Sequence, residues 1–111
     1  MINTRASERY AKSLLSISID ENLVDQIKLD IDLITKYFEE SRDISNLYSS
    51  PIIPINNKIK ITEKVFEDKL NKHTLNLLYN LIYRKRDNLI ITILEKFKEL
   101  YNTHMNIEES V

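Results

Sequence analysis

The sequence predicts an all-α protein, and three observations lead to this fold class. The 111 residues include no glycine and two prolines, so the tight turns that join β-strands in hairpins lack their usual residues. Apolar residues recur at three- and four-residue intervals along most of the chain, as they do on one face of a helix. Apolar residues make up 42% of the chain and charged residues 30%, which is typical of one folded globular domain.

The first helix is expected to begin at Asn3 or Thr4, whose side chains can cap the free N–H groups of a first turn, and to end near Ile19. Its apolar side is formed by Ala6, Tyr10, Leu14 and Ile17 and is widened by Ala11, Leu15 and Ile19. A turn at Asp20–Asn22 precedes the second helix, whose apolar stripe consists of Leu23, Ile27, Ile31, Ile34 and Phe38.

A short third helix is expected at Ile44–Ser49, with Asp43 as its cap. The segment Pro51–Pro54 ends it, because each proline lacks a backbone donor and disfavours helical geometry in the residue before it. The fourth helix should restart after Asn56 or Asn57. Its inward residues are predicted to be Ile59, Thr62, Val65 and Phe66.

The last two helices differ in character. The fifth, from a break near Asn71 to about Arg84, is apolar over about 240°, whereas a surface helix shows a stripe of roughly 100°. Such a helix is surrounded by its own domain or keeps one flank for a partner, and the first helix is similar. The sixth helix, from Asp87 to about Thr103, has one apolar side, formed by Ile90, Ile93, Leu94, Phe97, Leu100 and Tyr101. Its polar side is expected to consist of Thr92, Glu95, Lys96, Lys98, Glu99 and Asn102.

Several kinds of chemistry lack the residues that they need. Without cysteine there is no disulfide, thiolate zinc site or thiol catalysis, and without glycine there is no glycine-rich phosphate loop. His73 and His104 have no second ligand at helical spacing, so we interpret them as surface residues near helix ends. We therefore expect no catalytic residue, metal or cofactor, and a binding or structural role.

Charge also limits the classes of partner. The formal net charge of −1 gives no electrostatic footprint for nucleic acid or for an anionic membrane. The basic run Arg84–Arg86 lies where a helix ends, a place where the helix dipole alone favours cations. The N-terminal segment is too charged for a signal peptide or a membrane span, so we expect a soluble intracellular protein.

Three stretches, taken in order, carry a resemblance to a known family. They are Arg9-Tyr10-Ala11-Lys12-Ser13-Leu14; Leu47-Tyr48-Ser49-Ser50-Pro51 with Lys58 after it; and Leu75 to Leu81 followed by Arg86 and the ending Phe97-Lys98-Glu99-Leu100. They resemble the opening RYAKAL, the central leucine–proline–lysine pattern and the last two helices of the N-terminal domain of the bacterial ATP synthase delta subunit. The mitochondrial counterpart of that subunit is the oligomycin-sensitivity-conferring protein.

The resemblance implies a compact six-helix bundle, which agrees with the helix count from periodicity. It divides the chain into an N-terminal helical domain, residues 1–105, and the start of a linker, residues 106–111, to a C-terminal domain that is absent here. The family often has glycine where this chain has Lys85, just before the matched Arg86. We therefore expect the turn between the last two helices to be built differently.

By resemblance, the chain is a non-catalytic stator (peripheral stalk) component of F-type ATP synthase and not an enzyme. It would bind the N-terminal helical segments of the alpha subunits at the top of the catalytic head. It would meet the other stalk subunit only through the missing second domain, and it would neither bind nucleic acid nor insert into the membrane. The expected place is the bacterial cytoplasm, at the inner face of the cell membrane.

The family's docking groove lies between the first and fifth helices. The positions that match it here are Tyr10, Ser13, Asn76 and Asn80, and Ala6, Ile17, Tyr79 and Tyr83 lie on the adjoining stripes. The apolar members could equally belong to the core. Two alternatives stay open: a stand-alone helical adaptor or regulatory protein that binds a partner helix, and an all-α nucleic-acid binder that uses Arg84–Arg86.

Overall fold

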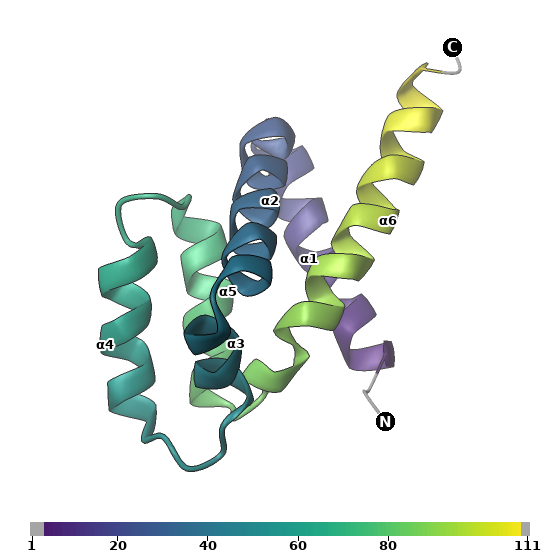
Figure 1. Ribbon diagram of the computed structural model, residues 1–111. Helices are drawn as coiled ribbons and strands as arrows, with labels where there is room; N and C mark the ends of the chain where they lie inside the picture. Colours follow the sequence, from purple (N-terminus) through teal and green to yellow (C-terminus); the bar gives the residue numbers. More distant parts are fainter. Residues whose placement is uncertain (1–3, 110–111) are drawn as a thin grey trace.

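The computed structural model describes residues 4–109 and confirms the all-α fold class (Figure 1). It consists of α1 (Thr4–Asp20), α2 (Val24–Glu40), α3 (Arg42–Ser49), α4 (Ile55–Phe66), α5 (Lys72–Tyr83), the 3-10 helix η1 (Asp87–Leu89) and α6 (Ile90–Glu109). Residues 4–109 contain no strand. Within the same range, none of the helices is both long enough and apolar enough to cross a membrane.

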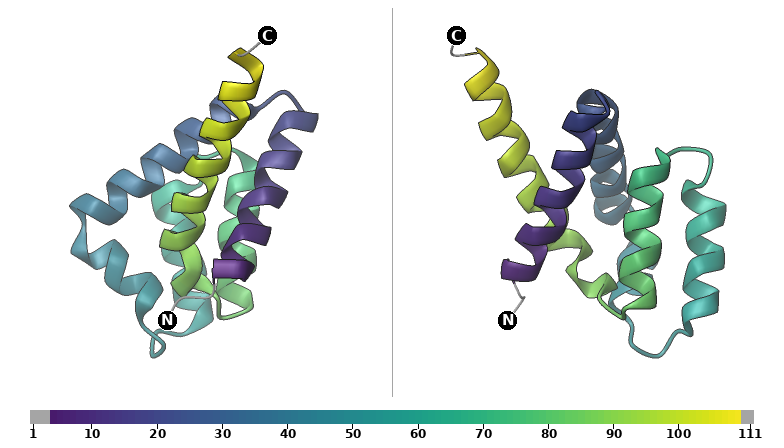
Figure 2. Two further views of the ribbon diagram at one scale, coloured as in Figure 1. Left: turned by 90° about the vertical axis from the view of Figure 1, so that its right-hand side faces the viewer. Right: turned by 180° about the vertical axis from the view of Figure 1, so that it is seen from behind.

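The helices form two pairs with α2 and α3 between them. The pair α4–α5 lies on one side and the pair α1–α6 on the other (Figures 1 and 2). The most extensive helix contact joins α1 to α6, whereas α1 and α5 approach each other along a much smaller part of their length. The last turns of α6 project beyond the body of the bundle (Figure 2).

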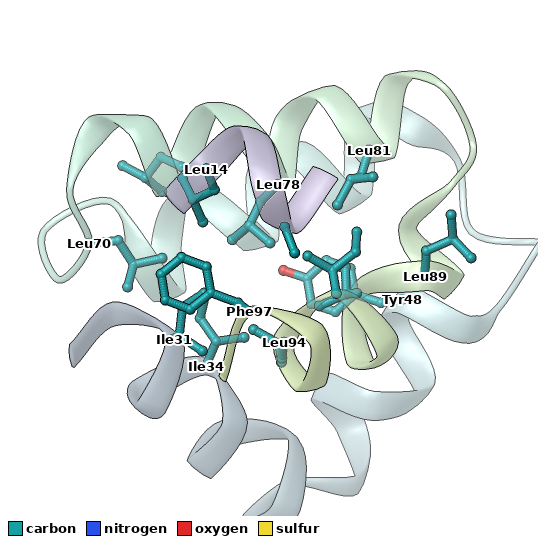
Figure 3. Close-up of a cluster of buried hydrophobic side chains, with 14 of the residues drawn as sticks. Leu14, Ile31, Ile34, Tyr48, Leu70, Leu78, Leu81, Leu89, Leu94 and Phe97 are labelled. Carbon is teal, nitrogen blue, oxygen red and sulfur yellow. The ribbon is translucent and has the colours of Figure 1, made fainter. Parts of the chain in front are cut away.

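All six helices contribute side chains to one hydrophobic core, part of which Figure 3 shows. The expected apolar stripes are confirmed: Ile27, Ile31 and Ile34 of α2 are buried, as are Thr62 and Phe66 of α4. On α6, the buried residues include Ile90, Ile93, Leu94 and Phe97. The apolar periodicity therefore predicted which side of these helices faces inward.

The boundaries of three helices differ from the expectation. Ser41, and not Asp43, caps α3, because its hydroxyl accepts a hydrogen bond from the backbone N–H of Ile44 at 3.3 Å. α4 begins directly after Pro54, whose fixed φ of −61° suits the entry to a helix. α6 continues past Thr103 to Glu109, since neither glycine nor proline interrupts it. The expected cap Asn3 lies outside the described residues, and the domain boundary at residue 105 stays a prediction.

The buried faces of α1 and α6 differ from the expected ones, because they include polar residues with small side chains. Ser7 and Ser18 are fully buried, and the Ser18 hydroxyl donates to the Leu15 carbonyl at 2.7 Å. Thr92 is buried although the pattern placed it on the polar side of α6. Small side chains allow neighbouring helices to pack closely whether or not they are apolar. Since α1 buries a face that includes Ser7, Ala11 and Ser18, its expected main stripe is left partly free.

The turn after α5 has the usual backbone geometry of a helix end, so the expectation that the lysine at this position would change its construction is wrong. Lys85 has φ of 58°, in the left-handed region where glycine is the usual residue. Its N–H donates to the Ile82 carbonyl at 3.0 Å, and the N–H of Arg86 donates to the Leu81 carbonyl at 2.7 Å. This pair of bonds is the ordinary Schellman ending of a helix. The lysine adopts the glycine conformation, and the turn is retained.

Candidate functional site

A groove lies between α1 and α5. It encloses about 270 Å³. It is lined by Tyr10, Ser13, Leu14 and Ile17 of α1 and by His73, Asn76, Leu77 and Asn80 of α5. The two helices run in opposite directions, since the end of α1 meets the start of α5, where Glu21 contacts His73, and Arg86, which follows α5, contacts Tyr10.

The structure brings together five of the eight residues that the sequence singled out. Those five are Tyr10, Ser13, Ile17, Asn76 and Asn80. Ala6 does not line the groove and is buried in the core, with 3% of its surface exposed. Tyr79 is half-buried near Glu63 of α4 and Glu67, the residue that follows α4, and its pKa is raised, first by burial and then by these carboxylates. Tyr83 is 61% exposed and lies outside the groove lining.

The structure adds three residues to the lining. Leu14 and Leu77 belong to the wide apolar arcs of their helices, and these arcs were the available signal for them. His73 was interpreted as a surface residue, but it is half-buried, and its Nε2 lies 3.0 Å from Oε1 of Glu21. That contact spans 52 positions of the sequence, so helical periodicity could not reveal it.

The groove combines apolar contact surface with polar groups along its edges. Leu14, Ile17 and Leu77 supply aliphatic surface. Asn76 and Asn80 are exposed, and their side-chain amides form no hydrogen bond with the side chains described, those of residues 5–106. Each amide can donate and accept. Such a surface suits an amphipathic helix that lays its apolar face in the groove and meets polar groups at its margins.

The structure offers no comparable support for bound metal. Among the residues that the structure describes, no group of three or more histidine, aspartate or glutamate side chains could hold an ion. The buried carboxylates Asp30 and Asp87 have protein partners instead.

Comparison with known proteins identifies the family to which the chain belongs. The sequence pattern of the family described as "ATP synthase delta (OSCP) subunit" matches residues 6–111. The chain belongs to this family. The family is that of a non-catalytic subunit, and the expectation that the chain is not an enzyme is thereby confirmed.

Individual relatives carry the delta-subunit name. The chain is similar to ATP synthase subunit delta of Chlorobium phaeobacteroides, with 33% identity over 100 residues, which cover 90% of this chain and 56% of the relative. It is also similar to ATP synthase subunit delta of Amoebophilus asiaticus, with 30% identity over 106 residues, which cover 96% of this chain and 58% of the relative. The chloroplastic delta subunit of Trieres chinensis is 31% identical to this chain over 94 residues, which cover 84% of this chain and 50% of the relative. The chain therefore spans little more than half the length of these relatives.

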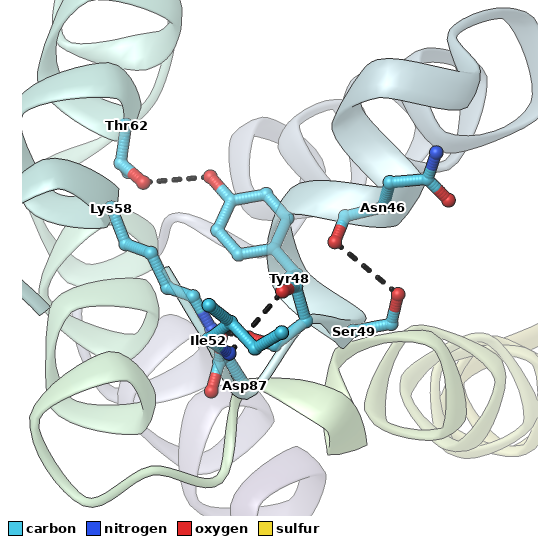
Figure 4. Close-up of polar contacts among 8 residues, drawn as sticks. Asn46, Tyr48, Ser49, Ile52, Lys58, Thr62 and Asp87 are labelled. Carbon is cyan, nitrogen blue, oxygen red and sulfur yellow. Dashed lines mark hydrogen bonds and ion pairs between the residues drawn. The ribbon is translucent and has the colours of Figure 1, made fainter. Parts of the chain in front are cut away.

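The leucine–proline–lysine pattern that resembles the delta (OSCP) family has a physical role in this chain. Lys58 Nζ donates to the Ser50 carbonyl at 2.7 Å, just before Pro51, and pairs with Asp87 Oδ2 at 2.6 Å (Figure 4). Beside it, the hydroxyls of Tyr48 and Thr62 lie 2.7 Å apart. These contacts join α3, α4 and η1, which follows the turn at the end of α5.

A second buried group fixes the other end of α5. Asp30 of α2 accepts hydrogen bonds from the N–H of Asn71 and the hydroxyl of Thr74, both at 2.8 Å. Burial raises the pKa of Asp30 above its usual value, and the two hydrogen bonds oppose that shift. In this member of the delta (OSCP) family, polar contacts thus hold both ends of the α5 wall of the groove.

Proposed function

We propose that this chain is the helical domain of a stator subunit of F-type ATP synthase and that it binds the N-terminal helical segments of the alpha subunits. The observation that carries the proposal is the groove between α1 and α5, lined by Tyr10, Ser13, Ile17, Asn76 and Asn80. Membership of the delta (OSCP) family supports a place in the synthase complex. The domain catalyses nothing and holds the head against rotation through this contact.

The binding mode is an amphipathic helix laid in a groove. Apolar residues at spacings of three and four along the alpha segment rest on Leu14, Ile17 and Leu77, and its polar margin meets Asn76 and Asn80. The complex places the domain on the cytoplasmic side of the bacterial cell membrane, as a peripheral component. The relatives in this family are named as delta subunits of the same enzyme.

Titration calorimetry tests the proposal with a peptide of the N-terminal segment of the alpha subunit from the same organism. Tyr10→Ala removes a half-buried aromatic side chain from the groove wall and should cost about 2 kcal/mol, roughly a thirtyfold loss of affinity. Asn80→Arg places a long charged side chain across the groove and should reduce binding at least as much.

The matched control is Asn102→Arg, which makes the same exchange at an exposed asparagine of α6 outside the groove lining. This variant should bind like the wild type, and thermal melting of every variant shows that it is folded. Folded Tyr10→Ala and Asn80→Arg variants with wild-type affinity would place the docking site elsewhere. Absence of binding to the wild-type domain would favour the alternative, an adaptor for a different helix.

A further inference from the structure

The groove continues into a second hollow, which is basic, beside the N-terminal half of α1. This hollow is lined by Arg9, Tyr10, Ser13, Arg84 and Arg86. Tyr10 and Ser13 line both hollows, so the two form one continuous surface. The three arginines are exposed, and their guanidinium groups are accessible to a partner that lies along the groove.

Among the side chains that the structure describes, those of residues 5–106, no carboxylate pairs with any of these arginines. The acidic residues next to them in the sequence have other partners. Glu8 pairs with Lys12 at 3.0 Å, and Asp87 pairs with Lys58 at 2.6 Å. Three like charges around one hollow repel one another, and a carboxylate placed among them would be attracted to all three.

The backbone conformation of the turn after α5 explains why two of the arginines lie at the same hollow. Lys85 adopts the left-handed conformation at the end of α5, and the chain leaves the helix there. Arg84 and Arg86 line the basic hollow, whereas Lys85 lines a different hollow near Asp87. The basic run is thus divided between two surfaces, and both of its arginines lie at the groove.

The opposite end of the groove is chemically different. There His73 Nε2 and Glu21 Oε1 lie 3.0 Å apart, and no arginine lines that end within the described part of the chain. The groove is therefore electrostatically asymmetric along its length. A helix bound in it encounters, at one end, a cluster of arginines that has no carboxylate partner within residues 5–106.

We propose that the docked helix carries a carboxylate side chain at the end that lies over Arg9, Arg84 and Arg86. This inference rests on the proposed function and specifies the partner of the same groove. Guanidinium groups form charge-assisted, often bidentate hydrogen bonds with carboxylates. The contact therefore selects acidic amphipathic helices and fixes which end of the helix lies beside the start of α1.

Two peptides test the proposal against the wild-type domain by titration calorimetry. One is the N-terminal segment of the alpha subunit from the same organism, and in the other every Glu and Asp is replaced by Gln and Asn. Arg9→Gln, Arg84→Gln and Arg86→Gln should each weaken the natural peptide about two- to fivefold, as expected for exposed charge pairs. The same variants should leave the affinity of the amide peptide unchanged.

Arg42→Gln is the matched control, because it removes one exposed guanidinium group from α3, outside both hollows. It should change the affinity of neither peptide. Raising the salt concentration from about 50 to about 300 mM should reduce the difference between the two peptides, since screening weakens exposed charge pairs. The combined variant with all three arginines replaced should bind both peptides equally.

The outcomes separate this inference from the proposed function. If the two peptides bind the wild type equally while Asn80→Arg still weakens binding, the carboxylate contact is overturned and the groove stands. If Asn80→Arg also has no effect, both proposals fail. A duplex DNA of mixed sequence serves as a third probe. DNA binding that requires the three arginines would assign the cluster to nucleic acid and overturn the inference.

Discussion

Lys58 and Asp87 form a buried ion pair in which Nζ and Oδ2 lie 2.6 Å apart and each side chain is 7% exposed. The pair joins α4 to η1, and the same ammonium group holds the Ser50 carbonyl (Figure 4). η1 directly follows the turn that contains Arg84 and Arg86, so this pair holds the segment next to the basic end of the groove.

Asp87→Ala should destabilise the domain by about 3–5 kcal/mol, because it leaves the Lys58 ammonium group buried without its counter-ion. Urea unfolding followed by circular dichroism measures this change. Asp68→Ala, at an exposed aspartate before α5, is the control and should change stability by less than about 0.5 kcal/mol. An equally small effect of Asp87→Ala would show that the ion pair contributes nothing beyond its burial cost.

Asp30→Asn should change how stability depends on pH. The folded-state pKa of Asp30 is raised above the ordinary aspartate value of 3.8, chiefly by burial. Its contribution to stability is therefore complete below that value and is lost as pH rises through the folded pKa. The amide cannot ionise and keeps an acceptor for Asn71 and Thr74. Relative to the variant, the wild type should thus be more stable at about pH 4 than at about pH 7.

Urea unfolding of both proteins at the two pH values provides the measurement, with Asp68→Asn, at an exposed aspartate before α5, as the control. If the advantage of the wild type grows toward neutral pH, the two hydrogen bonds to the carboxylate outweigh its burial. In that case the folded pKa lies below the usual value and the argument from desolvation is wrong.

The helices and most of their inward faces could be predicted from sequence because periodicity is local information. The stripe of Ile27, Ile31 and Ile34 needed no knowledge of what packs against it. The contacts that support the groove are not local. The Lys58–Asp87 pair spans 29 positions and the Thr74–Asp30 bond 44, and each of these residues alone resembles solvated surface charge or polarity.

The groove was predictable only in part, for a related reason. The wide apolar arcs of α1 and α5 indicated spare surface, and the family resemblance placed it between these helices. Which residues line it depends on how α1 rotates against α6. The buried side of α1 includes Ser7 and Ser18, and a hydrophobicity pattern does not distinguish these buried serines from exposed ones. Ala6 was therefore expected at the groove but lies in the core.

Lys85→Gly should stabilise the domain. A non-glycine residue in the left-handed region is strained by roughly 1–2 kcal/mol, while glycine adds freedom to the unfolded chain. The net gain should be about 1 kcal/mol, a rise in Tm of roughly 4 °C for a domain of this size. Differential scanning calorimetry measures it. Asn22→Gly is the comparison, since Asn22 also has φ of 58° but asparagine tolerates this region, and its gain should be smaller.

A neutral or destabilising effect of Lys85→Gly would mean that the lysine side chain contributes more to the folded state than its backbone strain costs. The basic end of the groove offers a second readout. The glycine variant keeps the turn, so binding of the natural alpha peptide should be unchanged, and a loss of affinity would show that the turn had moved.

Two adjacent leucines of α5 should separate stability from binding. Leu78 is 2% exposed and lies in the centre of the core (Figure 3), so Leu78→Ala should cost about 2–5 kcal/mol of unfolding free energy. Leu77 is half-buried and faces the groove, so Leu77→Ala should cost about 1 kcal/mol, the typical value for a point substitution. Urea unfolding of both variants checks this order.

The affinities of the same two variants for the alpha peptide should follow the opposite order. Leu77→Ala removes aliphatic surface from the groove and should weaken the peptide about tenfold, as expected for the loss of about 1.4 kcal/mol of contact. Leu78→Ala, measured at a temperature where it is fully folded, should bind within about threefold of the wild type, because Leu78 does not line the groove. If both variants lose affinity in proportion to their loss of stability, the peptide responds to the integrity of the whole bundle, and the groove between α1 and α5 is not its specific site.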